Sequence, residues 1–567
     1  MKSAIKKLFL AQQTSIFSAA TVIMLMVVAS RVLGLVRQRT LAYFFTPGDL
    51  ALFFAAFRLP DLVFEVLVFG TFSSAFIPVF TNALKKGKKE AWQIASTVTN
   101  LGLLVFIPVA VIVVLFADRL YGFLAPGFGP DHRDQIVLLS RILFAAQGFF
   151  VISYVLTAVL ESSRRFLIPA IAPLFYNLGI IFGTFFFAKP LGLLGPVIGV
   201  VIGAASHFLI QLPLAHRLGF RFSRKITIDS GVKKIGKLAL PRVIEVSFLQ
   251  VAKTVELFLA SLISTASYTY FTFGNSLQLL PVGIFGTSVA KAALPTLARQ
   301  IESPDEFRKT LFNALYQVSF LILPIAAVLI ILRIPLVRLV FGTDIFSWEA
   351  TVQTGMVVSA FGVGVVFQAM AALLARGFYA LHDTKTPVAI SISTIILNVL
   401  LDFILIKGFG FPAWGLAAAF SFACFSQVVC LFIFMTKRLS LRPNLALLLP
   451  FVKSVFASII SGGVMFFILK FFDRSVWVKR LSFLGKLDGR NIPFEKFVLD
   501  TRYTANLLIL TFFVVAIGGL VYYLMSVLLR SKELDYFIGL VRRMIAVRRI
   551  APVPAKEEEP VTPLDNI

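Results

Sequence analysis

Charged residues, cysteine and histidine are all scarce in this chain, and each scarcity excludes a class of function. Charged residues make up 14% of the 567 residues and hydrophobic residues 58%, whereas soluble domains have about 25% charged residues. Cys424 and Cys430 are the only cysteines and share one apolar run, which gives no case for a disulfide or a metal site. The four histidines have no ligand spacing, and no Gly-rich loop ends in Gly-Lys-Ser/Thr. We therefore predict a multi-pass membrane protein that is not an enzyme.

Acidic residues are also outnumbered, because 54 Lys and Arg face 28 Asp and Glu. No nucleic-acid motif accompanies this basic excess, so we expect no nucleic-acid partner. The basic residues cluster in alternate loops between apolar runs, as they do in cytoplasmic loops. We therefore expect both termini on the cytoplasmic side. The segment 473–503, expected outside, carries several basic residues and runs against this interpretation.

Apolar runs of membrane-spanning length predict an all-α fold with about fourteen transmembrane helices. An even number of spans also places both termini on one side of the membrane. The predicted spans are 15–38, 50–82, 91–117, 135–160, 167–188, 192–216, 238–263, 267–297, 310–341, 350–378, 387–407, 412–436, 447–472 and 504–529.

Two motifs recur along the chain. The motif that begins at Phe69 in the second span returns at Phe285 in the eighth, and the motif that ends at Asn177 in the fifth span returns at Asn398 in the eleventh. Both pairs link spans six apart, which predicts two six-helix lobes plus two C-terminal helices, and duplicated halves are typical of transporters. The predicted domains are an N-terminal lobe (1–216), a basic cytoplasmic linker (217–237), a C-terminal lobe (238–436), a C-terminal helix pair with an outer loop at 473–503 (437–530), and a cytoplasmic tail with a disordered end (531–567).

Charges inside the first two spans are informative, because a charge in hydrocarbon needs a partner, water or a function. Arg31 and Arg37 fall within and at the far edge of the first span. The second span holds Arg58 and Asp61 three residues apart, so the two side chains can pair, and Pro60 favours a break in the helix. The alternative to a functional site here is a structural ion pair at a kink.

The seventh span carries a stripe of charge. Arg242, Glu245, Lys253 and Glu256 are spaced so that all four share one helix face. A lipid-facing stripe of four charges is untenable, so we predict that it faces a polar cavity. The alternative is that the four residues neutralise one another between helices.

The eleventh span offers oxygen ligands. Asn398 and Asp402 lie one turn apart on one face, and with Glu256 from the seventh span they would suit a small hard cation.

The sixth span has small residues at regular spacing. Gly195, Gly199 and Gly203 predict close helix packing without a further function. His207, one turn on, is interpreted as a packed histidine.

Several motifs follow one another along the chain. They are Ser30–Arg37, Ala56–Asp61, Gly70–Pro78, Arg165–Asn177, Gln278–Gly286 and Arg376–Pro387. Together they closely resemble the motifs of the MurJ (MviN) family of lipid II flippases, and the resemblance covers about residues 15 to 530. It implies a bacterial inner-membrane protein of the MOP exporter superfamily, with fourteen helices in two lobes. Such a protein moves undecaprenyl-diphosphate-linked peptidoglycan precursor to the outer leaflet by alternating access.

The resemblance implies that Arg31, Arg37 and Arg58 meet the diphosphate, and a bidentate guanidinium suits that group. The residues predicted to bind substrate are Arg31, Arg37, Arg58, Lys253 and Lys291, and the predicted polar cavity residues are Asp61, Arg242 and Glu245. Some family members hold sodium in the C-terminal lobe, and Glu256, Asn398 and Asp402 fall at plausible matching positions.

The chain departs from the family pattern at three positions. Gln38 stands where an acidic residue is usual, and Phe64, beside Glu65, and Ser276 stand where arginines are usual. We expect Lys253 and Lys291 to compensate for the two missing arginines.

The expected partners are lipid II or a related polyprenyl-diphosphate glycan, membrane lipids and cell-wall synthesis proteins, with no cofactor other than a sodium ion. Besides the lipid II flippase, two hypotheses stay open. One is a flippase for another polyprenyl-diphosphate glycan or an ion-coupled small-molecule exporter of the same superfamily. The other is a non-transporting membrane scaffold with the same fold.

Overall fold

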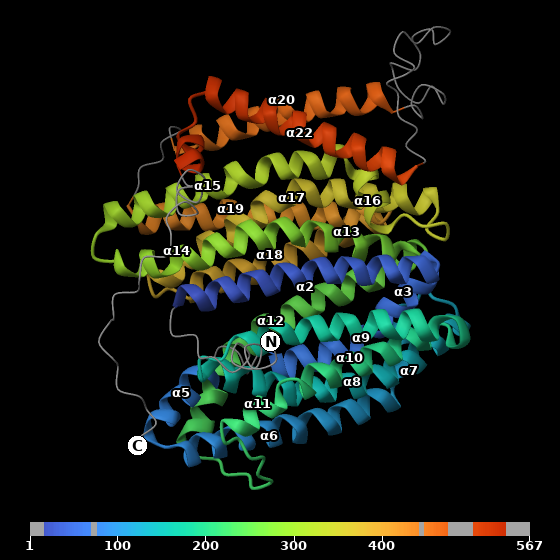
Figure 1. Cartoon of the computed structure of the whole chain (residues 1–567), viewed down its shortest axis with the longest axis vertical. Helices are drawn as coiled ribbons and strands as arrows, with labels where there is room; N and C mark the ends of the chain where they lie inside the picture. Colours follow the sequence, from blue (N-terminus) through green and yellow to red (C-terminus); the bar gives the residue numbers. More distant parts are fainter. Residues whose placement is uncertain (1–15, 70–75, 441–446, 474–502, 540–567) are drawn as a thin grey trace, which may run out of the picture.

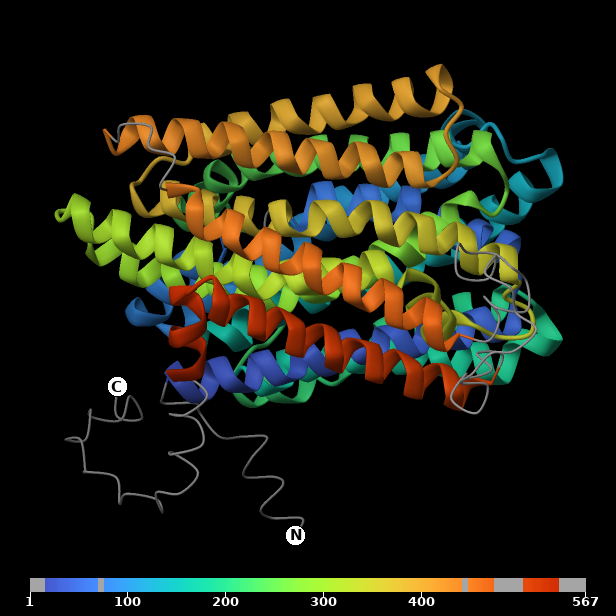
Figure 2. The same ribbon diagram turned by 90° about the horizontal axis from the view of Figure 1, so that it is seen from above.

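The computed structural model describes residues 16–69, 76–440, 447–473 and 503–539. The described residues form long helices that run side by side, as the two perpendicular views show (Figures 1 and 2). Within these residues, 12 helices are long and apolar enough to cross a membrane. Helix α2 and the broken second span supply the remaining predicted spans. The prediction of an all-α, multi-pass membrane protein is confirmed.

The first lobe contains the first six predicted spans. The second of these is divided into four helical pieces, α3, α4, η1 and α5. The helices of this lobe are α2 (Ile16–Phe44), α3 (Pro47–Ala56), α4 (Arg58–Phe64), the π-helix η1 (Glu65–Phe69), α5 (Ile77–Lys86), α6 (Lys88–Leu115), α7 (Ala117–Leu124), α8 (Pro130–Ser162), α9 (Leu167–Leu191), α10 (Leu194–Leu209) and α11 (Leu212–Arg217).

The second lobe and the C-terminal helices follow in chain order. They are α12 (Ser230–Ile263), α13 (Ser267–Pro281), the π-helix η3 (Val282–Gly286), α14 (Thr287–Arg299), α15 (Pro304–Ile331), α16 (Arg333–Phe341), α17 (Trp348–Ala380), α18 (Lys385–Phe403), the π-helix η4 (Ile404–Gly408), α19 (Trp414–Arg438), α20 (Leu449–Phe472) and α22 (Thr504–Leu528).

The lobes are stacked along the long axis of the molecule. Figure 1 shows most of the blue and teal helices of the first lobe at one end, most of the green to orange helices of the second lobe in the middle, and α20 with α22 at the other end; blue α2 and green α12 lie where the two groups meet. The helix pair α20 and α22 packs against α15 of the second lobe. Helix α12 lies between the lobes, because it contacts η1, α5, α6 and α7 on one side and α13 and α18 on the other. Helix α12 therefore forms part of the junction of the two lobes, together with the contacts of α13 with α3 and of α16 with α2.

A side chain from another helix satisfies the backbone that is exposed at the break in the second span. Pro60 has no N–H, so the carbonyl of Ala56 loses its usual helical donor. The buried Tyr121 hydroxyl of α7 donates to Ala56 O at 2.9 Å, and the N–H of Leu59 points to the same hydroxyl at 3.4 Å. The predicted break is confirmed, and a side chain from a neighbouring helix satisfies the backbone that it exposes.

The small residues of the sixth span make a close helix contact, as predicted. A Cβ atom on Gly199 of α10 would lie 2.6 Å from the carbonyl oxygen of Gly179 on α9, and one on Gly183 would lie 2.4 Å from the Cα of Gly199. Only hydrogen side chains allow the two backbones to approach this closely. The pair α9 and α10 is therefore a rigid part of the first lobe.

Several boundaries differ from the sequence prediction. The ninth span, predicted as 310–341, ends at Ile331, because α16 is a separate helix that begins at Arg333. Helix α12 begins at Ser230, inside the predicted linker 217–237, where the Asp229 side chain accepts from Val232 N at 2.8 Å and caps the helix. The outer loop 474–502 and the end of the tail lie outside the described residues.

Candidate functional site

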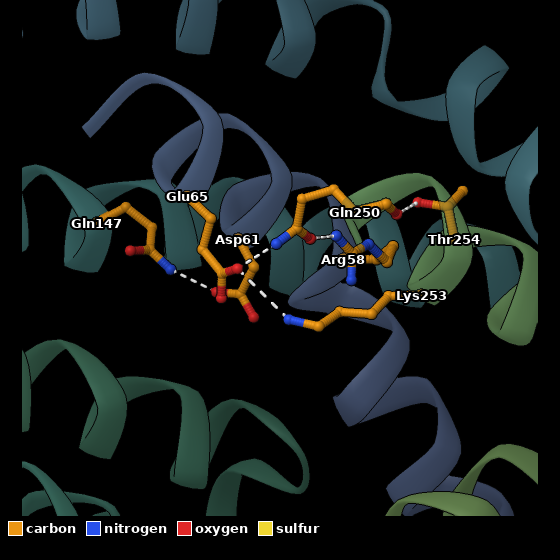
Figure 3. Close-up of polar contacts among 7 residues, drawn as sticks. All are labelled: Arg58, Asp61, Glu65, Gln147, Gln250, Lys253 and Thr254. Carbon is orange, nitrogen blue, oxygen red and sulfur yellow. Dashed lines mark hydrogen bonds and ion pairs between the residues drawn. The ribbon is translucent and has the colours of Figure 1, made fainter. Parts of the chain in front are cut away.

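A cluster of charged and amide side chains lies where α4 and η1 meet α12. We call it the central cluster (Figure 3), and it consists of Arg58, Asp61, Glu65, Gln147, Gln250, Lys253 and Thr254. Arg58, only 5% exposed, donates to the Oε1 atom of Gln250, and the Nε2 atom of Gln250 donates to Glu65 Oε2. One amide thus joins a cation and an anion.

Lys253 completes the link between η1 and α12. Its Nζ atom lies 3.4 Å from Glu65 Oε2, and the two side chains are 47% and 32% exposed. Thr254 donates to the backbone carbonyl of Gln250 at 2.8 Å. The carboxylate of Glu65 therefore accepts from two side chains of α12.

Asp61 points away from this pair and toward α8. The Nε2 atom of Gln147 donates to Asp61 Oδ1 at 2.7 Å. The ion pair between Arg58 and Asp61, allowed by their spacing, does not form among the described residues, because each side chain is bonded to an amide from a different helix. The Nε atom of Arg58 is buried and finds no partner within the described part of the chain.

The arginines of the first helix lie elsewhere. Arg31 is exposed on α2, and Arg37 is half-buried and interacts electrostatically with Tyr176 of α9. Neither arginine is bonded to the central cluster in the described structure. Of the five residues predicted to bind substrate, the fold brings together only Arg58 and Lys253 in that cluster.

Two of the departures from the family pattern meet each other. Gln38 of α2 donates to the hydroxyl of Ser276 of α13 at 2.6 Å, across the two lobes. Next to it, Arg39 donates to the carbonyls of Leu339 and Val340, near the C-terminus of α16, at 2.8 and 3.3 Å. A neutral hydrogen bond and a helix-terminus contact thus join the lobes here.

At the third position that departs from the family pattern, Phe64 packs against aromatic side chains. Phe64 is buried, and its ring lies 6.0 Å from that of Phe150 and 5.4 Å from that of Tyr154, both on α8. An aromatic contact therefore occupies the position at which the family pattern has a cation.

The remaining predicted residues are more dispersed. Lys291 is exposed on α14 and interacts electrostatically with Glu161 at the end of α8. Glu245 is half-buried on α12, and the side chain of Arg242 lies outside the described part of the structure. Within the stripe on α12, Lys253 pairs with Glu65 of η1 and also interacts electrostatically with Glu256.

The predicted cation ligands lie together. The Nδ2 atom of Asn398 donates to Asp402 Oδ2 at 2.8 Å, and the side chains are 6% and 0% exposed. Asn398 Oδ1 and Asp402 Oδ1 are buried without a hydrogen-bond partner among the described residues. Glu256 of α12 interacts electrostatically with Asp402. These oxygen atoms are the kind of ligand that a hard cation takes.

Sequence reasoning missed the two amides that organise the central cluster, Gln147 and Gln250. Both stand in the middle of apolar runs, and a buried amide there needs a partner as a charge does. Gln250 also lies one turn before Lys253 and Thr254 on α12. That spacing is the signal that could have identified it.

His207 behaves as a structural residue, as interpreted. Its Nδ1 atom lies 2.5 Å from Ser153 Oγ, and Gln211 donates to the His207 carbonyl at 3.0 Å. These bonds lie within the first lobe and apart from the central cluster.

Two repeated helical lobes in a membrane, with a charged cluster at their junction, define a multi-pass membrane transporter. The sequence profile of the family described as "Lipid II flippase MurJ" matches residues 40–486. The chain belongs to this family.

Relatives and solved structures agree with this membership. The chain is 30% identical to a "Probable lipid II flippase MurJ" of Vibrio cholerae over 74% of this chain and 82% of that protein. It is 27% identical to one from Thermotoga maritima over 89% and 95% of the two chains. The fold is similar to "Lipid II flippase MurJ, inward closed conformation", with TM-score 0.71, 23% identity and coverage of 90% and 98%. It is also similar to an inward-facing multidrug resistance MATE family transporter of the MOP superfamily, with TM-score 0.63, 15% identity and coverage of 72% and 94%.

Proposed function

We propose that this protein moves lipid II from the cytoplasmic to the outer leaflet of the bacterial cytoplasmic membrane by alternating access. Membership of the flippase family is the observation that carries the proposal. The fold supports it, because two repeated lobes joined through α12 can rock against each other around a site at their junction. The family match does not favour a small-molecule exporter or a scaffold.

The proposed substrate contacts are cationic. Arg31, Arg37, Arg58, Lys253 and Lys291 supply the positive charge for the diphosphate, and guanidinium groups bind such an anion in a bidentate way. Arg58 and Lys253 are held in one cluster between the lobes, which supports this assignment. In the same proposal Asp61, Arg242 and Glu245 line the path as polar residues. We propose that one headgroup path passes all eight of these positions.

We also propose that a sodium ion is bound by Glu256, Asn398 and Asp402. The unpartnered oxygens of Asn398 and Asp402 fit this ion, and Glu256 adds a second carboxylate nearby. A bound cation would neutralise buried carboxylates in the second lobe. Its binding energy would then bias the conformational cycle.

The proposed setting follows from the same assignment. Both termini lie on the cytoplasmic side, where the basic loops are, and membrane lipids surround the bundle. Cell-wall synthesis proteins, which consume the flipped precursor, are the proposed protein partners.

Complementation tests the proposal. Expression in a bacterial strain depleted of its own lipid II flippase should restore growth and normal cell shape, and a reconstituted assay should show movement of lipid II across vesicles. Growth failure despite normal membrane expression, or equal movement of an unrelated lipid-linked sugar, would contradict it.

A further inference from the structure

The carboxylate of Glu65 holds both cations of the central cluster. It accepts directly from Lys253 at 3.4 Å, and it accepts from Gln250, whose other amide atom accepts from Arg58 (Figure 3). Asp61 accepts a hydrogen bond from Gln147 instead and interacts with Arg58 and Lys253 electrostatically. Lys253 is thus paired directly with Glu65, and Arg58, from a different helix, is linked to the same carboxylate through the amide of Gln250.

The charge of the cluster is balanced in this state. Arg58 and Lys253 carry two positive charges, and Asp61 and Glu65 carry two negative charges. A neutral cluster gives an incoming diphosphate little net attraction, and a carboxylate beside the cations repels it. An anionic headgroup can therefore bind well here only if one carboxylate leaves. Glu65 is the carboxylate that contacts Lys253 and is linked through Gln250 to Arg58.

Glu65 is placed so that it can leave. It is the first residue of the π-helix η1, where the helical register changes, and its side chain is 32% exposed. Lys253 is 47% exposed, so a ligand can reach the ammonium group without repacking the core. Single π-helical turns within α-helical segments are frequent at functional sites.

We propose that Glu65 is an intramolecular counter-anion, which occupies Arg58 and Lys253 in the empty transporter and competes with the phosphate groups of the substrate for them. This inference rests on the proposed function. Glu65 is a positioning and specificity-determining residue in this scheme: it keeps the cations ordered inside the membrane and sets how strongly they attract an anion. Release of the substrate is assisted when Glu65 returns.

Binding of farnesyl diphosphate, a short polyprenyl diphosphate, to the purified full-length protein tests the inference. Glu65→Gln keeps an acceptor for Gln250 and loses the charge, so its dissociation constant should fall by roughly tenfold, the effect of removing one nearby like charge. Glu65→Ala should change affinity in the same direction, and Lys253→Met should weaken binding. The matched control is Asp305→Asn, whose side chain is 96% exposed on α15 and should leave affinity unchanged.

A double-mutant cycle and a transport assay separate competition from a merely structural role. In the Lys253→Met background the gain from Glu65→Gln should shrink, because one of the cations for which Glu65 competes is gone. In reconstituted vesicles Glu65→Gln should lower both KM and kcat, since the substrate binds tighter and leaves more slowly. A structural role would instead raise KM or lower the thermal stability with KM unchanged.

The outcomes distinguish this inference from the proposed function. If the wild type binds the diphosphate and complements the depleted strain, but both Glu65 variants bind no tighter than the wild type, the inference is wrong and the function stands. If the Glu65 variants bind tighter while no protein moves lipid II, the counter-anion is supported and the substrate assignment is wrong. If no variant binds the diphosphate, the inference is wrong, and complementation by the wild type decides the proposed function separately.

Discussion

The two lobes repeat each other in backbone shape but not in the placement of charge. The repeated motif that begins at Phe69 and Phe285 is accompanied by a π-helix in both lobes, η1 and η3. In the register of that repeat, Glu65 of the first lobe corresponds to Pro281 of the second. The first lobe therefore holds an anion at a position where the second lobe has an apolar ring.

In the other repeated motif, the second lobe has the ionisable residue and the first lobe has an apolar one. Asn177 and Asn398 occupy matching positions, and both are buried. Asn177 donates to the carbonyl of Pro173 at 3.1 Å, whereas Asn398 donates to Asp402, which corresponds to Ile181 in the first lobe. Helix geometry is thus shared by both halves, while ionisable residues are specific to one half. This contrast is consistent with the proposal that Arg58 of the first lobe meets the anion together with Lys253 of α12, and that Asn398 and Asp402 of the second lobe are cation ligands.

Of the variants considered, Arg58→Ala should lower transport and stability the most. Arg58→Ala leaves Asp61 and Glu65 with only Lys253 to balance them, and breaking a buried charge network costs about 3 kcal/mol or more. We expect loss of complementation and a lower melting temperature in detergent. Arg299→Ala, at an exposed position on α14, is the control and should behave as wild type. Normal transport by Arg58→Ala would remove Arg58 from anion binding.

Replacement of Asp402 should test the second lobe. The melting temperature of the wild type should be higher in sodium chloride than in choline chloride, because an ion that binds only the folded state stabilises that state. Asp402→Asn should abolish that rise, while Asp344→Asn, at an exposed loop position, should keep it. An equal sodium response in both variants would contradict the cation site.

The glycine contact of the first lobe predicts a smaller effect. Gly199→Ala places a methyl group 2.6 Å from a backbone oxygen of α9, and such overpacking costs about 2 kcal/mol. Gly463→Ala on α20 has open space and should be neutral or slightly stabilising. Comparison of the melting temperatures of the two variants checks this. Equal values would mean that α9 can move away from α10.

The smallest effect on stability is expected for a change of Asp383, in the loop before α18. Hydrogen bonds from the N–H and hydroxyl of Thr386 hold the pKa of Asp383 below its ordinary value. A carboxylate with a lowered pKa stabilises the fold above its unfolded pKa, and this contribution is lost as the pH falls through the folded value. Asp383→Asn should therefore cost less than about 1 kcal/mol at pH 7, because the site is open to solvent. The difference from wild type should shrink as the pH falls below about 3.8, the ordinary pKa, and should vanish below the lowered pKa of Asp383. A difference that stays constant as the pH falls would contradict the assignment.

The sequence was a good guide to the fold because apolar length and local backbone chemistry are written along the chain. The spans, the break at Pro60 and the glycine contact of α10 depend on neighbours in sequence or on residue size. The ion-pair partners were predicted less well. Arg58 and Asp61 are close in sequence, yet amides on α8 and α12 decide where each side chain points. Partner choice of this kind depends on which helices the fold brings together.

The hydroxyl of Tyr121 that satisfies the break between α3 and α4 also constrains how the protein is made. In hydrocarbon an unsatisfied carbonyl is costly, and water is not there to replace the missing donor. Because α7 follows the second span in the chain, the broken segment has no partner for Ala56 until the ribosome has delivered the third span and Tyr121. The second span is therefore expected to complete its insertion together with the helices that follow it, and Tyr121→Phe should impair membrane assembly before it impairs transport.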